Sequence, residues 1–186
     1  MKMLNDDIKN FHDECGKVDE FEDKIKKIRN REEKSQKIRE KKDSLKRVSS
    51  LMNQIKISFL RQIESGNFLN VSDNEIVEFA RALGRFLSYS IKMNTIRRFL
   101  TAFREIEKTK SYSELVLIRP KLAYAVGRSG SEERLYMQVL MDFFDPILQK
   151  TSATADNDEQ AKKFEKNLKF MEAIIAYYRY YGGGNE

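Results

Sequence analysis

The sequence predicts an all-α protein, and three observations support that class. Only two prolines and eight glycines occur among 186 residues, while Lys, Glu, Arg, Leu and Ile are abundant, a composition typical of helices. Apolar residues recur at intervals of three and four through most of the chain, which is the period of an α-helix. No stretch keeps an apolar–polar alternation with a period of two, so we expect no sheet.

Residues 1–49 read as a charged N-terminal extension with few apolar positions. Four apolar residues between 18 and 28 follow helical spacing, but only two of residues 29–47 are apolar. A stretch of that kind is a solvated helix held by ion pairs, a coiled-coil arm or a mobile extension. The apolar pattern resumes after residue 45 with its phase shifted by one, which indicates an interrupted seam and not one continuous coiled coil.

The next part of the chain shows the end of one helix and the starts of two more. The first helix ends near the Ser-Gly-Asn at 65–67. Ser72 and Glu75 form a capping box, in which each side chain satisfies the other residue's backbone N–H. After a polar break, Asn94 or Thr95 is the expected N-cap of the following helix.

Segment 111–128 predicts a further helix. Pro120 either kinks it or opens it at its first turn. Gly127 is placed to end the helix. Leu117, Leu122 and Tyr124 are expected to face the core.

Two long helices complete the expected set. The first runs over residues 131–150 and should bend at Pro146. The second covers residues 158–181 and carries apolar residues on every side, which predicts the central helix of a bundle. For its four C-terminal tyrosines we favour packing over the stacking of bases. The chain therefore divides into the extension 1–49, a compact helical bundle 50–182 and a disordered tail 183–186.

The residues available for catalysis are few. The chain has one histidine and one cysteine, in the consecutive run His12-Asp13-Glu14-Cys15. Because consecutive residues do not converge on one point, we interpret this run as a solvated helix face and expect no metal site. No glycine-rich phosphate loop precedes a helix. We therefore expect no catalytic residue, no metal and no cofactor, and an enzyme is disfavoured.

Membrane insertion and secretion are not expected either. No window of 18 residues is apolar and uncharged. The first seven residues contain no apolar run of the kind found in a secretory signal. The single cysteine, Cys15, cannot form an internal disulfide, so a cytoplasmic location is the default expectation.

The net charge of +6 is concentrated in the middle of the chain. Residues 73–130 hold 11 Lys and Arg against 6 Asp and Glu, whereas residues 131–186 carry a net charge of −3. Such a segment could attract a polyanion. Many soluble domains carry a similar excess, so the charge alone favours neither a polyanion nor a solvated surface.

Two arginines at the start of one predicted helix, and a lysine before it, stand out. Arg97 and Arg98 fall in its first turn, where the positive end of the helix dipole disfavours cations. They either hold an anion, or pair with Glu105 or with an acid from the last third of the chain. Lys92 continues the spacing of two earlier arginines and is added to this candidate set.

Four segments together resemble a known family, and their order and spacing match as well as their composition. They are residues 93–100, 117–128, 143–148 and 170–182, of which Leu117-Ile-Arg-Pro-Lys-Leu-Ala-Tyr-Ala-Val-Gly-Arg128 is the most specific. The C-terminal two-thirds of the chain thus resembles the small subunit of the type III-A (Csm-type) CRISPR interference complex. The resemblance covers roughly residues 70–182.

The resemblance implies an all-α bundle of about five helices that is not itself a nuclease. It implies copies that stack along a filament beside the backbone and large subunits, lining the groove where guide and target RNA pair. Base pairing reads the sequence in such complexes, so the protein needs only backbone contacts. The basic positions implied are Arg97, Arg119, Lys121 and Arg128, to which the cation spacing adds Lys92 and Arg98.

One alternative function stays open. A helical scaffold could dimerise through its N-terminal arm and place the basic middle against an acidic protein surface, with no RNA contact. Dissociation of the native assembly by RNase would separate the two hypotheses.

Overall fold

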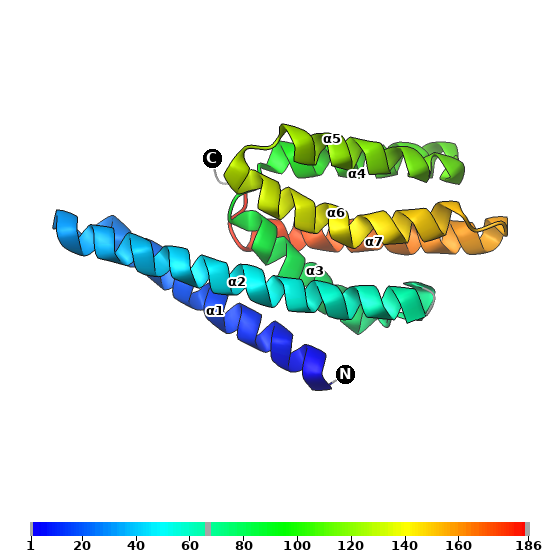
Figure 1. Cartoon of the computed structure of the whole chain (residues 1–186). Coiled ribbons are helices and arrows are strands. Elements are labelled where there is room, and N and C mark those ends of the chain that lie inside the picture. Colours follow the sequence, from blue (N-terminus) through cyan, green and yellow to red (C-terminus); the bar gives the residue numbers. More distant parts are fainter. Residues whose placement is uncertain (1, 66–67, 185–186) are drawn as a thin grey trace. The chain divides into compact units, whose positions relative to one another are not determined.

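The computed structural model describes residues 2–65 and 68–184, and these form seven α-helices and two short 3-10 helices with no strand among them (Figure 1). The helices are α1 (Lys2–Lys27), α2 (Arg31–Ser65), α3 (Asp73–Ser88), α4 (Met93–Thr109), α5 (Ile118–Arg128), α6 (Ser131–Ser152) and α7 (Asn157–Tyr180), with 3-10 helices η1 (Phe68–Asn70) and η2 (Tyr112–Leu117). The predicted all-α class is confirmed. The predicted five helices are an undercount, because the N-terminal extension supplies a long helix of its own and most of a second.

The chain divides into two compact units at Ile55 and Lys56, within α2. The extension predicted for residues 1–49 falls inside the first unit, and the bundle predicted for 50–182 includes all of the second unit up to residue 182. No described helix has the length and apolar character needed to cross a bilayer.

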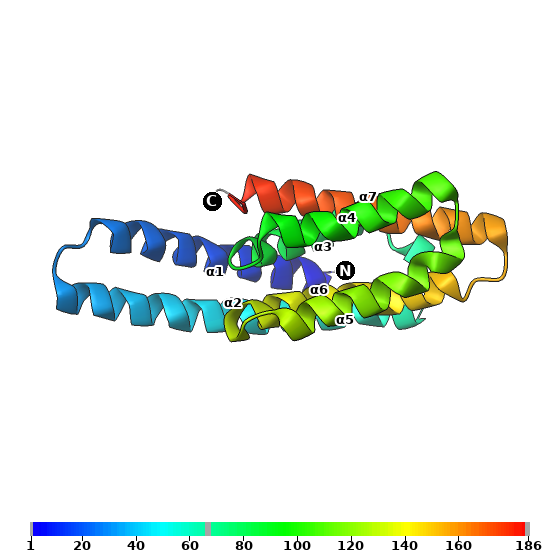
Figure 2. The same ribbon diagram turned by 90° about the horizontal axis from the view of Figure 1, so that it is seen from above.

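The first unit is a helical hairpin. Figure 2 shows α1 and the N-terminal part of α2 side by side and antiparallel, joined by residues 28–30. The Asn30 side chain starts α2 by accepting hydrogen bonds from the backbone N–H groups of Glu32 at 2.9 Å and Glu33 at 3.4 Å. The reversal explains the phase shift in the apolar pattern, because the two parts of the seam lie on different helices.

Ion pairs cross between the two helices of the hairpin. Arg47 of α2 donates to Glu14 of α1 at 2.7 Å, and Lys41 of α2 donates to Glu22 at 3.0 Å. Nearer the turn, the Lys37 ammonium lies 5.7 Å from the centre of the Phe21 ring. Of the three alternatives for residues 29–47, the solvated helix held by ion pairs is the one that this structure adopts.

The run from His12 to Cys15 is not the solvated face that its charges predicted. Cys15 is fully buried and Glu14 is only 6% exposed, while Asp13 is exposed. The apolar spacing of Phe11, Cys15 and Val18, all fully buried, directs this side of α1 inward. No group of three or more His, Cys, Asp and Glu residues among the described part of the chain could hold a metal ion.

Glu14 keeps its charge although it is buried. Burial alone would raise its pKa, but hydrogen bonds from Lys17, Arg47 and Ser44 outweigh that effect and lower the pKa to about 2. Lys17 donates at 2.8 Å, and Arg47 also donates to the buried Ser44 hydroxyl at 2.8 Å. The ionised carboxylate thus ties α2 to α1.

The second unit has an aromatic core. The end of α2 inserts Phe59, whose ring centroid lies 4.8 Å from those of Phe79 on α3 and Phe143 on α6. Phe144 of α6 stacks on Phe170 of α7 at 5.4 Å. The helix predicted to be central, α7, contacts α3, α4, α6 and both 3-10 helices.

A close approach of α3 to α7 needs a glycine. A Cβ at Gly84 would lie 2.7 Å from the backbone oxygen of Ile174 and 2.8 Å from the Tyr177 side chain. The start of α3 matches the prediction, since Ser72 caps it and the reciprocal capping box with Glu75 is formed. The close approach at Gly84 sets α3 against α7, and the capping box fixes where α3 begins.

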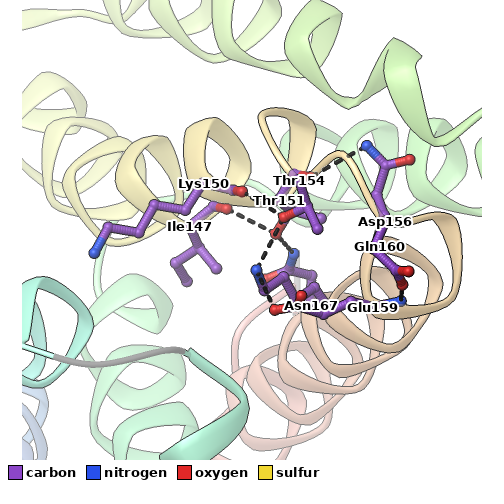
Figure 3. Close-up of polar contacts among 9 residues, drawn as sticks. Ile147, Lys150, Thr151, Thr154, Asp156, Glu159, Gln160 and Asn167 are labelled. Atoms are coloured by element: carbon purple, nitrogen blue, oxygen red, sulfur yellow. Dashed lines mark hydrogen bonds and ion pairs between the residues drawn. The ribbon is translucent and has the colours of Figure 1, made fainter.

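Buried polar groups hold the turn between α6 and α7 (Figure 3). The Thr151 hydroxyl donates to the backbone oxygen of Ile147 at 2.8 Å and accepts from the Asn167 amide at 2.9 Å. Gln160 donates to the Thr151 backbone oxygen at 3.2 Å, and Asp156 caps α7 through the N–H of Glu159. Helix α6 is continuous through Pro146.

The C-terminal glycines fold back as a turn. The N–H of Gly183 donates to the Tyr178 backbone oxygen at 2.9 Å, and a Cβ at Gly183 would clash with the Tyr178 ring. The buried Tyr178 hydroxyl donates in turn to the Ile91 backbone oxygen. Of the predicted disordered tail, Gly183 and Gly184 belong to this turn, and residues 185 and 186 lie outside the described residues.

Candidate nucleic-acid interface

The start of α4 leaves backbone N–H groups without a side-chain cap. The helix begins at Met93, and the N-cap residue is Lys92, whose side chain makes no capping hydrogen bond. The predicted caps Asn94 and Thr95 are wrong, because both already lie within the first turn. The positive end of the helix dipole is therefore uncompensated by a side chain at this point.

Three of the predicted cations surround this helix start. Lys92, Arg97 and Arg98 are all exposed, and none pairs with a carboxylate of the described residues. The competing expectation was an ion pair with Glu105 or with an acid from the last third of the chain. Arg104, further along the same helix, pairs with Glu107 of α4 and with Glu172 of α7.

Helix α5 contributes two further cations. Ile118, Leu122 and Val126 are buried at intervals of four, so Lys121 and Arg128 lie on the exposed side of the helix. Pro120 lies in the first turn of α5, which is the second of the two alternatives predicted for it. Gly127 is inside the helix and does not end it, since α5 continues to Arg128.

Tyr124 belongs to the same exposed side. Its side chain is 66% exposed and that of Leu117 is 53% exposed, so the prediction that both face the core is wrong, whereas Leu122 is buried as predicted. The Arg128 guanidinium lies 5.5 Å from the centre of the Tyr124 ring and donates to its hydroxyl at 3.3 Å. This contact orients Arg128 without neutralising it.

Three adjoining hollows bring these cations together. A groove of about 740 Å³ includes Arg98, Lys121 and Arg128 in its lining, and a hollow of about 510 Å³ includes Arg97, Arg98 and Lys121. A third, of about 580 Å³, includes Lys92 and Arg97. We call Lys92, Arg97, Arg98, Lys121 and Arg128 the basic track, because each hollow shares cations with the next.

The comparisons with known proteins bear on this unit. The family model described as Csm2 Type III-A matches residues 70–184. The chain belongs to the Csm2 family. This is the family of the small subunit of the type III-A CRISPR effector complex, as the four sequence segments predicted. Comparison with curated proteins gave no match.

The Csm2 match includes the whole basic track and leaves out α1 and all of α2. Helices α3 to α7 are therefore the family's part of the chain. The hairpin lies outside it, so no property of Csm2 proteins carries over to the hairpin.

Arg119, the sixth predicted cation, is not brought into the track. Its guanidinium binds Asp145 of α6 through two hydrogen bonds, from Nε at 2.6 Å and from Nη2 at 2.9 Å. That hydrogen bonding raises the pKa of Arg119 above its usual value. In this Csm2 chain, Arg119 fastens α5 to α6 instead of standing free beside Lys121.

Sequence reasoning also missed residues at this surface. Arg179 of α7 is exposed and lines the same hollow as Lys92 and Arg97. Its position within a run of tyrosines suggested packing, and nothing local shows that the end of α7 meets the start of α4. Three acids, Glu105, Glu132 and Glu133, also line the hollows, where Arg179 and the track cations outnumber them.

Proposed function

We propose that the chain is the non-catalytic small subunit of a type III-A effector complex and binds the sugar–phosphate backbone of the guide–target RNA through the basic track. Copies would stack along the filament beside the backbone and large subunits in the cytoplasm. The observation that carries the proposal is the track itself. Its five exposed cations come from the N-cap of α4, from α4 and from α5, have no carboxylate partner among the described residues, and line three hollows that share lining residues.

The chemistry of the track suits phosphates and not bases. Lys and Arg bind phosphate oxygens whatever the sequence, whereas base recognition needs side chains that match particular donor and acceptor patterns. Sequence reading by base pairing leaves the protein to supply sequence-independent attraction. The uncapped N-terminus of α4 adds partial positive charge next to Lys92.

The test uses the assembled complex and the triple variant Arg97→Gln, Arg98→Gln and Lys121→Gln. Neutral glutamines keep the helices intact and remove three phosphate contacts per copy. We expect weaker target-RNA binding, and a plot of log affinity against log salt that is shallower by about 2 per contacting subunit. Unchanged affinity and slope would contradict the proposal.

A matched control removes the same charge elsewhere. Lys9, Lys108 and Lys162 are exposed, have no ion-pair partner among the described residues, and line none of the three hollows. Their substitution by Gln should leave both the affinity and its salt dependence at wild-type values. An equal loss in the control would mean that net charge, and not the track, attracts the RNA.

A protein-binding role is the second candidate. The large groove also exposes Leu117 and Tyr124, and exposed apolar side chains in a groove favour a protein neighbour. A scaffold without RNA contact would survive RNase treatment of the native assembly with its size unchanged. The proposed function predicts that RNase reduces the size of the assembly.

A further inference from the structure

The hairpin has its charges sorted along its length. Residues 24–42, on both sides of the turn, hold ten Lys and Arg against three Glu, a net charge of +7. Residues 1–23 hold three Lys against eight Asp and Glu, a net charge of −5. The end of the hairpin at the turn is therefore more positive than the whole chain, whose net charge is +6.

Ion pairs account for only four of those ten cations. Lys24, Lys26, Lys37 and Lys41 pair with acids of the hairpin. The other six are all exposed, and no carboxylate of the described residues pairs with them. They are Lys27, Arg29, Arg31, Lys34, Arg39 and Lys42.

The geometry of the hairpin keeps these six together. The turn at residues 28–30 brings the end of α1 beside the start of α2 (Figure 2). Arg31 and Lys42 are eleven residues apart, about three helical turns, so they share one side of α2 over about 16 Å. A strand of nucleic acid carries one phosphate per ~3.4 Å of duplex axis, so this length faces several phosphates.

We propose that this basic tip, the six cations named above, is a second binding site for the backbone of an RNA strand. The site lies outside the Csm2 match and does not depend on the basic track. Like the track, it would bind without regard to sequence, because only Lys and Arg are presented.

The surface of the tip favours RNA over an acidic protein. Protein interfaces need a desolvated core with apolar or aromatic anchors and are depleted in lysine. Between residues 24 and 42 the only large apolar side chain that is exposed is Ile38, at 40%. Six free cations without such an anchor match a flexible polyanion whose affinity comes from the release of counterions.

The experiment uses the full chain, a fluorescent oligouridine of about 30 nucleotides, and salt between about 50 and 300 mM. The variant is Arg31→Gln, Arg39→Gln and Lys42→Gln, which leaves the ion pairs of Glu14 and Glu22 in place. We expect at least about a tenfold loss of affinity near 100 mM salt, and a salt slope reduced by about 2. Circular dichroism should show unchanged helix content.

The control variant at Lys9, Lys108 and Lys162 should bind the oligouridine as the wild type does. The proposal is overturned if the tip variant matches that control, or if the wild-type chain does not bind the oligouridine at low salt. It is also overturned if the tip variant loses binding to poly-glutamate but keeps its affinity for RNA, which would assign the tip to an acidic protein.

The track variant at Arg97, Arg98 and Lys121 separates this inference from the proposed function. Loss of RNA binding in the tip variant alone would support the tip and contradict the track. Loss of RNA binding in the track variant alone would support the track and contradict the tip. If both sites bind, the two variants each lower the salt slope and their effects add in the combined chain.

Discussion

The contacts that join the helices differ in emphasis between the hairpin and the bundle. Across the hairpin, helix contacts include the ion pairs of Arg47 with Glu14 and of Lys41 with Glu22. The bundle relies on aromatic rings, with Phe59 at the centre of a cluster drawn from four helices. In both units the cations fall into two groups. Arg47 of the hairpin and Arg119 of the bundle join helices, whereas the cations of the basic tip and of the basic track have no carboxylate partner among the described residues.

Removing a ring from the aromatic core of the bundle should destabilise the protein more than any other single change. Phe59→Ala removes a fully buried ring and should lower the free energy of unfolding by about 3–5 kcal/mol. Urea denaturation followed by circular dichroism measures this loss. Ile38→Ala in the hairpin, where the side chain is 40% exposed, serves as the control with an expected change below about 1 kcal/mol. Equal losses would contradict the burial of Phe59 in the aromatic core.

Acid should act on the hairpin through Glu14. Its pKa of about 2 lies below the ordinary value of 4.5, so its ionised form stabilises the fold above pH 4.5, and this stability is lost as the pH falls toward 2. The shift corresponds to about 3 kcal/mol. Thermal unfolding between pH 7 and pH 2 should show this loss in the wild type.

Two variants isolate the contribution of Glu14. Glu14→Gln should be less stable than the wild type at pH 7, and the difference should shrink toward pH 2 because the wild-type carboxyl then becomes neutral. Asp13→Asn, at the exposed neighbour, should leave the acid loss in place. A Glu14→Gln chain with the wild-type pH profile would contradict the structural role of this carboxylate.

Two glycines in helices differ in their surroundings: Gly84 lies tightly against α7, whereas Gly127 has open space around it. Gly84→Ala places a methyl group within 2.8 Å of three atoms of α7 and should destabilise the bundle by about 1–3 kcal/mol. Gly127→Ala in α5 meets nothing within 4 Å and should stabilise the helix by up to about 1 kcal/mol. Thermal melts of the two variants should therefore move in opposite directions, and a shift of the same sign would refute the packing of α3 on α7.

A smaller effect distinguishes two cations of α5. Arg119→Gln removes the two hydrogen bonds to Asp145 and should cost about 1–2 kcal/mol of stability without changing the salt dependence of RNA binding. Lys121→Gln should leave the stability unchanged and make the salt dependence of RNA binding shallower, since the Lys121 ammonium has no carboxylate partner among the described residues. Melting temperatures and RNA titrations on both variants make this comparison, and it fails if Arg119→Gln alone alters the salt slope.

Local signals predicted the fold better than they predicted the surface. The capping box of Ser72 and Glu75 was readable because both halves lie within one turn. The ion pair of Arg119 could not be predicted in this way, because its partner Asp145 is 26 positions away on another helix. Tyr124 was misplaced for a related reason: the side of α5 that is buried depends on where α6 packs, and the sequence of α5 alone does not specify this.

The hairpin shows the same limit on a larger scale. Its charged composition left a helix, a coiled coil and a mobile arm as alternatives. The ion pair that decides among them joins Glu14 to Arg47, 33 positions apart. The six unpaired cations of the basic tip can be identified only once the structure shows which neighbouring cations, such as Lys41, are paired with acids.

Site-resolved crosslinking shows whether the basic track lies against RNA in the assembled complex. In the assembled complex, a target RNA containing 4-thiouridine would be irradiated, and the crosslinked peptides of this subunit identified by mass spectrometry. The basic track predicts crosslinks within residues 92–98 and 121–128, with none at Lys108 or Lys162. Crosslinks confined to other parts of the bundle, or none to this subunit, would contradict the proposed contact between the track and the RNA.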